Sequence, residues 1–296
     1  MRILVTGGAG FVGSNLALAL ADESHDVTVL DDFSAGNFVN LVKFKGDVIG
    51  ANCHTEPTGP FDIIFHQASI TDTTVTDQHR MMVNNVEGFR QVLSWAAAWK
   101  ARVVWASSAA VYGNMAPPMT ETSTPHPLNV YGYSKMVMEH VARLWHKQTG
   151  LPCVGLRYFN VYGPGEQHKG KFASMIFQLA QQMKAGHRPR IFRDGTQKRD
   201  FVWIDDVVQA NLKAAEISSG EVFNVGSGMA ESFNAVVAAL NVVMHTNYEP
   251  EFIDNPYHFF QNHTEANLER SMRVLGYAPR AGLMEGVREY YGSGSL

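Results

Sequence analysis

The stretch that decides the fold is Ile3-Leu4-Val5-Thr6-Gly7-Gly8-Ala9-Gly10-Phe11-Val12-Gly13, an apolar run that ends in a glycine-rich turn. Ser14 to Ala21 follows at once and predicts a helix. Glycine permits a tight turn and lets backbone N–H groups approach a phosphate at the positive end of a helix. The spacing of Gly7, Gly10 and Gly13 departs from the G-x-G-x-x-G form, and such turns also occur in proteins that bind nothing. The turn alone is therefore weak support for a dinucleotide site with contacts at Gly7, Gly10, Phe11 and Val12.

Short apolar runs alternate with helical patterns over the first half of the chain. The runs that predict strands are Ile3-Leu4-Val5, Val27-Thr28-Val29-Leu30, Ile63-Ile64-Phe65 and Val103-Val104-Trp105. Two later helices are predicted at Val86 to Lys100 and from about Tyr131 to Gly150, the second with Val137, Val141, Leu144 and Trp145 at helical spacing. This alternation is typical of an α/β fold with a parallel sheet.

The alternation loosens after Val154-Gly155-Leu156. We therefore expect residues 1–162 to form mainly a dinucleotide-binding domain and residues 163–296 mainly a smaller substrate-binding lobe. Residues from about 201 to 228 are expected to return to the first domain. The closing Gly292-Ser293-Gly294-Ser295-Leu296 has the composition of a flexible tail.

The composition excludes several classes of protein. A net charge of -4 over 296 residues provides no general attraction to nucleic acid or to an anionic membrane, so neither partner is expected. The cysteines are Cys53 and Cys153 alone and the 12 histidines are scattered, which suits a reducing cytoplasm and predicts no metal site. No apolar run reaches the roughly 18 residues of a membrane span. The first apolar run meets glycine too early for a signal peptide.

Asp31 ends the second predicted strand. A carboxylate at this place accepts hydrogen bonds from the ribose hydroxyls of an adenosine dinucleotide. A 2′-phosphate would meet Asp31 and Asp32 with no nearby Arg, which favours NAD as the cofactor and leaves NADP as the alternative. The other interpretation of Asp31 is a helix cap or loop residue.

Tyr131 and Lys135 lie four residues apart at a predicted helix start, so both side chains project from one face. We expect the ammonium, together with a nicotinamide cation, to lower the pKa of the phenol, which then exchanges a proton with a sugar hydroxyl. Ser108 follows a predicted strand that ends near Trp105, at the edge where parallel sheets bind ligands, and can donate to the reacting oxygen. Each pattern alone also fits a solvated helix face or a serine-rich turn. Their order along the chain points to an enzyme.

Further motifs extend this order over nearly the whole chain: His66-Gln67-Ala68-Ser69, Asn84-Asn85-Val86, Arg157-Tyr158-Phe159-Asn160-Val161-Tyr162-Gly163-Pro164 and Arg199-Asp200-Phe201-Val202. With them the chain resembles the extended short-chain dehydrogenase/reductase family of nucleotide-sugar enzymes, in its NAD-dependent epimerase/dehydratase group. The resemblance implies a Rossmann fold, a doubly wound parallel sheet with a smaller C-terminal substrate-binding lobe. It also implies a catalytic triad of Ser108, Tyr131 and Lys135. The substrate diphosphate would contact Asn160 and Arg199, whose other interpretations are a turn residue and a surface ion pair. Further cofactor contacts are expected at Asp47, Val48, Gln67, Ala68 and Asn85.

The residues after the catalytic serine bear on the reaction. Related dehydratases carry an Asp-Glu pair there, whereas this chain has Ala109 and Ala110. We therefore expect epimerisation, in which a sugar carbon is transiently oxidised to a ketone and hydride returns to the opposite face.

A closer resemblance, to the ADP-glycero-manno-heptose 6-epimerases, lies in four segments: Leu128-Asn129-Val130-Tyr131-Gly132-Tyr133-Ser134-Lys135, Gly163-Pro164-Gly165-Glu166-Gln167-His168-Lys169-Gly170, Phe38-Val39-Asn40-Leu41 and Ala230-Glu231-Ser232-Phe233. It implies that Lys169 is a second acid/base and a substrate contact. The alternative is an exposed loop lysine attracted to phosphate.

Two departures leave the ligand open. Asn37 stands where the heptose enzymes commonly carry a lysine that meets an NADP phosphate, and Asp254 to Gln261 lacks a basic residue that many relatives place near the nucleotide or sugar. The expected substrate is a nucleotide-diphosphate sugar, with ADP-heptose as one candidate, and the resemblance implies a homo-oligomer. The alternatives are a UDP- or GDP-hexose 4-epimerase, a nucleotide-sugar reductase and, in another class, a dinucleotide-binding protein that has lost catalysis.

Overall fold

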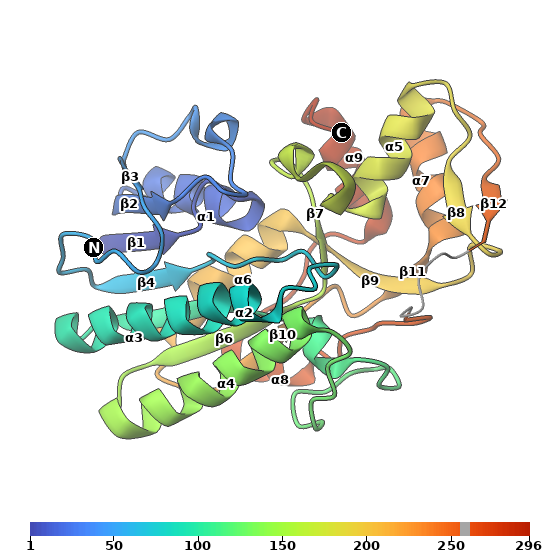
Figure 1. The fold of residues 1–296 in the computed structure, drawn as a ribbon. Coiled ribbons are helices and arrows are strands. Elements are labelled where there is room, and N and C mark those ends of the chain that lie inside the picture. The colour runs from blue at the N-terminus through green and yellow to red at the C-terminus, as the bar shows by residue number, and fades with distance from the viewer. Residues whose placement is uncertain (255–260) are drawn as a thin grey trace.

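The computed structural model describes residues 1–254 and 261–296. Figure 1 shows the path of the chain. The strands are β1 (Arg2–Thr6), β2 (Asp26–Asp31), β3 (Asp47–Gly50), β4 (Ile63–His66), β5 (Arg102–Ser108), β6 (Cys153–Tyr158), β7 (Asn160–Tyr162), β8 (Arg190–Phe192), β9 (Lys198–Trp203), β10 (Val222–Val225), β11 (Ala230–Ser232) and β12 (Glu251–Ile253). The α-helices are α1 (Phe11–Asp22), α2 (Gln78–Met82), α3 (Gly88–Trp99), α4 (Val130–Thr149), α5 (Met175–Lys184), α6 (Ile204–Glu216), α7 (Phe233–Met244), α8 (Glu269–Leu275) and α9 (Leu283–Gly292). Short helical turns are η1 (Phe38–Leu41), η2 (Val83–Glu87), η3 (Ala109–Tyr112) and η4 (Gln167–Phe172).

The central sheet confirms the predicted fold class. Among the described residues its strands run in the order β10-β6-β5-β4-β1-β2-β3, and all neighbours are parallel. The order reverses between β1 and β4, because the chain first adds β2 and β3 on one side of β1 and then crosses to the other side. In an open α/β sheet this switch point opens a crevice at the carboxyl ends of the strands.

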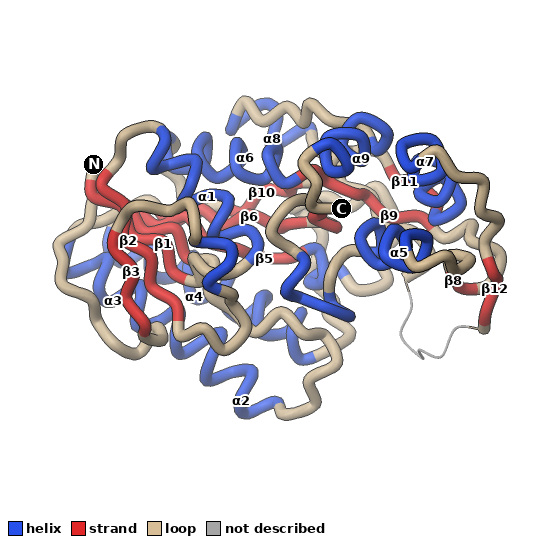
Figure 2. Tube along the Cα trace, turned by 90° about the horizontal axis from the view of Figure 1, so that it is seen from above, coloured by secondary structure: helices blue, strands red, loops and turns tan. Residues whose placement is uncertain are grey.

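Helices cover both faces of the sheet because successive strand residues point to opposite sides. Ile3 and Val5 of β1 join one apolar cluster with Leu16 of α1, whereas Leu4 joins a second cluster with Phe89 of α3. Figure 2 shows α1, α6 and α8 on one side of the strands and α3 and α4 on the other. The burial of both faces explains why these strands are continuous apolar runs rather than alternating ones.

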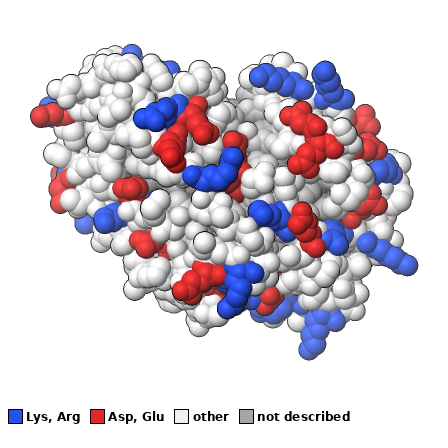
Figure 3. Space-filling model, turned by 180° about the vertical axis from the view of Figure 1, so that it is seen from behind, with Lys and Arg blue, Asp and Glu red and all other residues white. Residues whose placement is uncertain are grey.

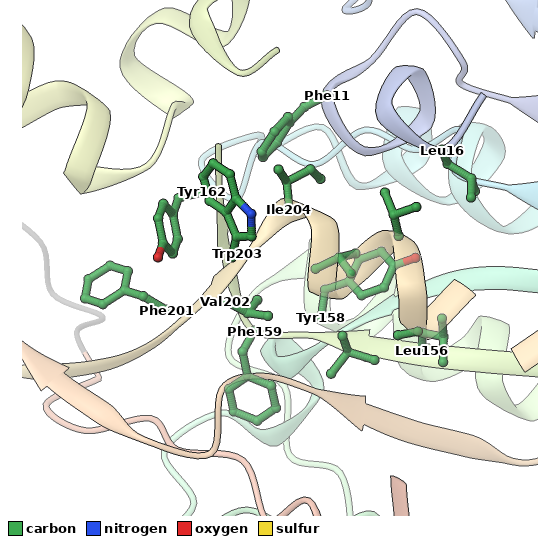
Figure 4. Close-up of a cluster of buried hydrophobic side chains, with 14 of the residues drawn as sticks. Phe11, Leu16, Leu156, Tyr158, Phe159, Tyr162, Phe201, Val202, Trp203 and Ile204 are labelled. Atoms are coloured by element: carbon green, nitrogen blue, oxygen red, sulfur yellow. The ribbon is translucent and has the colours of Figure 1, made fainter. Parts of the chain in front are cut away.

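The remaining elements gather beyond the carboxyl ends of the central strands. Strands β11, β9 and β7 form one small sheet and β12 pairs with β8, with α5 and α7 beside them (Figure 1). The ring of Tyr162 lies 5.4 Å from Trp203 and 6.5 Å from Phe201, and Figure 4 shows these rings beside Phe11 and Ile204. This aromatic cluster fixes the loop after β7 over the glycine turn.

Two local expectations differ from the structure. Leu144 lies on α4 but is 45% exposed, so it is not part of the buried stripe that contains Val141. Leu296 is 1% exposed and belongs to the core, and Gln167 donates to the Ser295 carbonyl at 2.8 Å, so the closing residues are docked rather than a free tail. The glycine-rich composition did not reveal the apolar anchor at its end.

The described residues contain no helix with the length and apolar character that a bilayer crossing requires. On the face seen in Figure 3, acidic and basic side chains are interspersed. That face therefore presents no extended field of one sign, in agreement with the small net charge.

Candidate active site

A cleft of about 890 Å³ lies at the switch point. Its walls come from the turns after β1, β2, β4 and β5, from the start of α4 and from the loop after β7. All four predicted catalytic residues line it: Ser108, Tyr131, Lys135 and Lys169. Segments more than 150 residues apart in the sequence thus meet in one volume.

The glycine turn is packed so closely against neighbouring backbone that a side chain would not fit at two of its positions. Gly7 has φ +68°, and a Cβ at this residue would lie 2.5 Å from the backbone nitrogen of Ala68. A Cβ at Gly13 would lie 2.2 Å from the Gly7 carbonyl oxygen. Gly10 caps α1 without a side chain, so the helix end faces the cleft with bare backbone. This cradle fits a pyrophosphate, which the first-turn N–H groups and the helix dipole favour.

Asp31 holds two turns together and also borders the cleft. Its carboxylate accepts hydrogen bonds from the backbone nitrogens of Ala9 at 2.9 Å and Phe33 at 2.8 Å, which fixes the glycine turn and the turn after β2. Burial raises the pKa of this carboxyl, while those two bonds lower it. Asp31 also lines the cleft, and each oxygen has a second lone pair for a ribose hydroxyl. Asp32 lines it as well and accepts from the Ser34 hydroxyl at 2.6 Å.

Three predicted cofactor contacts lie elsewhere. Asp47 and Val48 start β3 and do not line the cleft, whose wall there is formed by residues 51–54 instead. Asn85 is fully buried, and its side chain bonds to both backbone groups of Ile70 and to Ser134. It therefore positions the loop after β4, and its neighbour Asn84 lines the cleft.

Gln67 and Ala68 both line the cleft, and Gln67 is held by residues that the motif analysis did not single out as site residues. The Gln67 amide donates to Asn211 of α6 at 3.1 Å and accepts from the Tyr158 hydroxyl at 3.1 Å. Tyr158 and Asn211 also bond to each other. Tyr158 lies within a quoted motif, but the link to α6 is a tertiary contact with no local signal.

The predicted triad is assembled by β5 and α4. Asn129 caps α4 by accepting from Gly132, which starts the helix so that Tyr131 and Lys135 both face the sheet edge. The Ser108 side chain hydrogen-bonds Tyr131, and the Lys135 nitrogen donates to the Ala106 carbonyl at 2.8 Å. The same nitrogen lies 5.8 Å from the centre of the Tyr131 ring.

The pKa of Tyr131 differs from the expectation that a neighbouring ammonium would lower it. Burial raises the pKa of Tyr131, and the bond from Ser108 opposes that shift. Burial also lowers the pKa of Lys135 to about 7, because its charged form is disfavoured away from water. The lysine is therefore not a permanently protonated ammonium. The spacing of Tyr131 and Lys135 predicts their common face but not how deeply both are buried.

The predicted substrate residues Asn160, Lys169 and Arg199 also line the cleft. Burial lowers the pKa of Arg199 to about 10. Further cations line the same cleft and were missed by the sequence analysis: Arg80, Lys171 and Arg190. They come from separate elements, so only the folded chain reveals them as a group suited to a phosphorylated ligand. Most of the segment from Asp254 to Gln261, which lacks the basic residue that many relatives carry, lies outside the described residues, since residues 255–260 are not described.

Lys169 projects from η4 toward α1. Its nitrogen lies 5.6 Å from the centre of the Phe11 ring, which also lines the cleft. Burial lowers the pKa of Lys169, and the charge of Glu166 raises it. No cluster of His, Cys, Asp or Glu suited to a metal ion occurs within residues 1–254 and 261–296.

Comparison with known proteins agrees with this geometry. Residues 3–226 match the model of the NAD dependent epimerase/dehydratase family. Among solved structures, the chain is similar to ADP-L-glycero-D-manno-heptose-6-epimerase of Helicobacter pylori, with 40% identity, a TM-score of 0.91 and coverage of 99% of this chain and 95% of that chain. It is also similar to UDP-glucose 4-epimerase of Thermotoga maritima, solved with UDP-glucose, at 29% identity, a TM-score of 0.92 and 99% coverage of both chains.

A further similar structure is UDP-glucuronic acid 4-epimerase of Bacillus cereus in complex with UDP-glucuronic acid and NAD. It shares 27% identity and a TM-score of 0.86, covering 99% of this chain and 98% of that chain. The family match spans most of the sequence, including the glycine turn, the triad and Lys169. The chain belongs to the NAD dependent epimerase/dehydratase family.

Proposed function

We propose that this nucleotide-sugar epimerase inverts carbon 6 of an ADP-heptose through a transient ketone. The observation that carries the proposal is the presence of two proton-transfer groups in one cleft, Tyr131 from α4 and Lys169 from η4. When hydride returns to the opposite face, the ketone oxygen points in a different direction from the original hydroxyl. Each of the two orientations therefore needs its own proton-transfer group. The 40% identity to the Helicobacter pylori enzyme supports the choice of sugar and carbon.

The triad handles the first proton. When bound, a nicotinamide ring supplies a reversible hydride acceptor at the substrate carbon. The Tyr131 phenolate takes the proton of the substrate hydroxyl and becomes a phenol, while Ser108 donates a hydrogen bond to the same oxygen. Lys135, fixed by the Ala106 carbonyl, stays beneath the Tyr131 ring, where its protonated form stabilises the phenolate that takes this proton.

Lys169 provides the second proton site. Its nitrogen lies 5.6 Å from the centre of the Phe11 ring, and Lys169 belongs to η4 whereas Tyr131 belongs to α4. After the ketone turns, Lys169 can hold the proton that completes reduction from the other face. Its lowered pKa suits this task because a general acid/base works best near the ambient pH.

NAD is the proposed cofactor in preference to NADP. Asp31 and Asp32 line the cleft at the end of β2, and two carboxylates repel a 2′-phosphate. No Lys or Arg occurs between Asp31 and Val42 to offset them. The Bacillus cereus relative in complex with NAD is consistent with this choice.

The test is a substrate panel. Purified protein is incubated with ADP-, GDP- and UDP-sugars, and the recovered sugar is examined by NMR, which reports the sugar and the inverted carbon together. Inversion at carbon 6 of ADP-heptose supports the proposal. Inversion at carbon 4 of a UDP-hexose, or net consumption of NADH, would instead indicate a 4-epimerase or a reductase.

A variant pair tests the role of Lys169. Lys169→Met should lower kcat by about 10²- to 10⁴-fold while bound cofactor is retained. Lys147→Met, an exposed lysine near the end of α4, is the matched control and should turn over at the wild-type rate. Unchanged turnover in Lys169→Met would reject the second acid/base.

A further inference from the structure

Glu166 lies next to the segment that bears Lys169 and is fully buried. Its Oε1 accepts a hydrogen bond from the Gly163 backbone nitrogen at 3.2 Å and from the Ser174 hydroxyl at 2.8 Å. Its Oε2 accepts from the Ser174 backbone nitrogen. One carboxylate thus joins the two ends of the loop between β7 and α5.

The clamp extends into the flanking elements. The Ser174 hydroxyl also accepts from the Phe177 nitrogen at 3.2 Å and so caps α5. Within the loop, the Lys169 backbone nitrogen donates to the Glu166 carbonyl at 2.9 Å. The main chain of Lys169 is therefore tied directly to the residue that closes the loop.

Glu166 is also the acidic group that acts on Lys169. Desolvation lowers the pKa of Lys169 and the charge of Glu166 raises it. The effect is mutual: burial raises the pKa of Glu166, its hydrogen bonds lower it, and Lys169 lowers it further. The three donors offset part of the free energy lost when the Glu166 carboxylate leaves water.

We propose that Glu166 is a positioning residue for Lys169, which closes the loop from Gly163 to Ser174 and supplies the negative charge that keeps the lysine ready to carry a proton. This inference rests on the proposed role of Lys169 in catalysis. It goes beyond that role because it assigns the control of the lysine to a residue that does not line the cleft.

The groups around the pair define what can titrate with it. On η4, His168 feels the charge of Lys169, and Asp31 at the end of β2 acts on His168. From α1 the lysine meets the uncharged ring of Phe11, and from α9 Tyr290 feels the charge of Glu166. Among these described groups, Glu166 is the one whose charge raises the pKa of Lys169.

The experiment compares wild type, Glu166→Gln and Ser174→Ala in the cofactor-loaded protein. Trace labelling with acetic anhydride across a pH series, read by mass spectrometry, reports the titration of Lys169 without using activity. Exposed Lys147 is the reactivity reference. The pH profile of kcat is recorded in parallel.

Glu166→Gln removes the charge and should move the Lys169 labelling midpoint down by about one pH unit or more. In the pH profile of kcat, the limb that depends on the ionisation of Lys169 should also move to lower pH, whether the lysine acts as acid or base. Ser174→Ala keeps the carboxylate, so its midpoint should stay nearer that of wild type than that of Glu166→Gln. An identical midpoint in wild type and Glu166→Gln would overturn the proposal.

A second comparison remains decisive should Glu166→Gln fail to fold. The stability advantage of wild type over Lys169→Met should grow between pH 5 and pH 7, because the attraction exists only when Glu166 is ionised. A constant difference would overturn the proposal. Normal turnover in Lys169→Met would refute only the catalytic role, since both labelling and unfolding measure the pair directly.

Discussion

Glu139→Gln should destabilise the protein far more than an ordinary substitution. Glu139 of α4 and Arg157 of β6 form an ion pair whose side chains are 2% and 3% exposed. Two hydrogen bonds, at 2.8 Å and 2.7 Å, join the guanidinium to the two carboxylate oxygens. The Ser107 hydroxyl donates to the same carboxylate at 2.7 Å, so the pair also supports the strand end that carries Ser108.

The magnitude follows from leaving one charge buried. Gln keeps the size of the side chain but not its charge, and the guanidinium of Arg157 cannot lose its proton to compensate. Removal of one partner of a buried ion pair costs about 3–5 kcal/mol, a large part of a typical free energy of unfolding of about 5–15 kcal/mol. At roughly 2–4 °C per kcal/mol, Tm should fall by about 10 °C.

Urea unfolding followed by circular dichroism measures the change, with Tm as a second readout. Replacing both partners, Glu139→Leu with Arg157→Met, removes the orphaned charge and should recover part of the loss. A loss below about 1 kcal/mol in Glu139→Gln would refute the reasoning. A double variant no more stable than the single one would show that lost hydrogen bonds, rather than the charge, dominate.

Three further outcomes are expected. Tyr131→Phe should lower kcat by about 10²- to 10⁴-fold with cofactor still bound, and near-normal kcat would exclude the phenol as proton carrier. Gly13→Ala should weaken cofactor retention on gel filtration, because its Cβ would lie 2.2 Å from the Gly7 carbonyl oxygen and force the turn open; full retention would contradict this. Burial lowers the pKa of Lys135 to about 7, so between about pH 7 and 10 the unfolded chain binds more protons than the folded chain. The free energy of unfolding of wild type, measured in urea, should therefore rise relative to that of Lys135→Met as the pH increases over this range. A difference between the two proteins that does not change with pH would argue against a buried neutral lysine.

The elements that the sequence could predict are those with local signals. The apolar runs and the glycine turn sufficed for β1, α1 and the parallel sheet, because a strand buried on both faces is apolar throughout. The order of Ser108, Tyr131 and Lys135 predicted that these residues would meet, since strand ends and the following helix share one edge of the sheet.

What the sequence could not reveal depends on packing. Nothing local distinguishes Asn85, which holds a loop from the buried side, from Asn84, which lines the cleft. Likewise the sequence around Glu166 predicts only an acidic loop residue, and its role follows from its contacts with Gly163 and Ser174. The raised pKa of Tyr131 depends on burial that four-residue spacing does not report.

The most direct test of the central claim is epimerisation of ADP-L-glycero-D-manno-heptose in D₂O, followed by proton NMR of carbon 6. A mechanism that removes hydride and returns the same hydride predicts inversion at carbon 6 without deuterium at that carbon and without net NADH. Deuterium at carbon 6 would show that the carbon loses a proton to solvent, and the hydride account would be wrong. Absence of inversion at that carbon would contradict the assignment of the substrate.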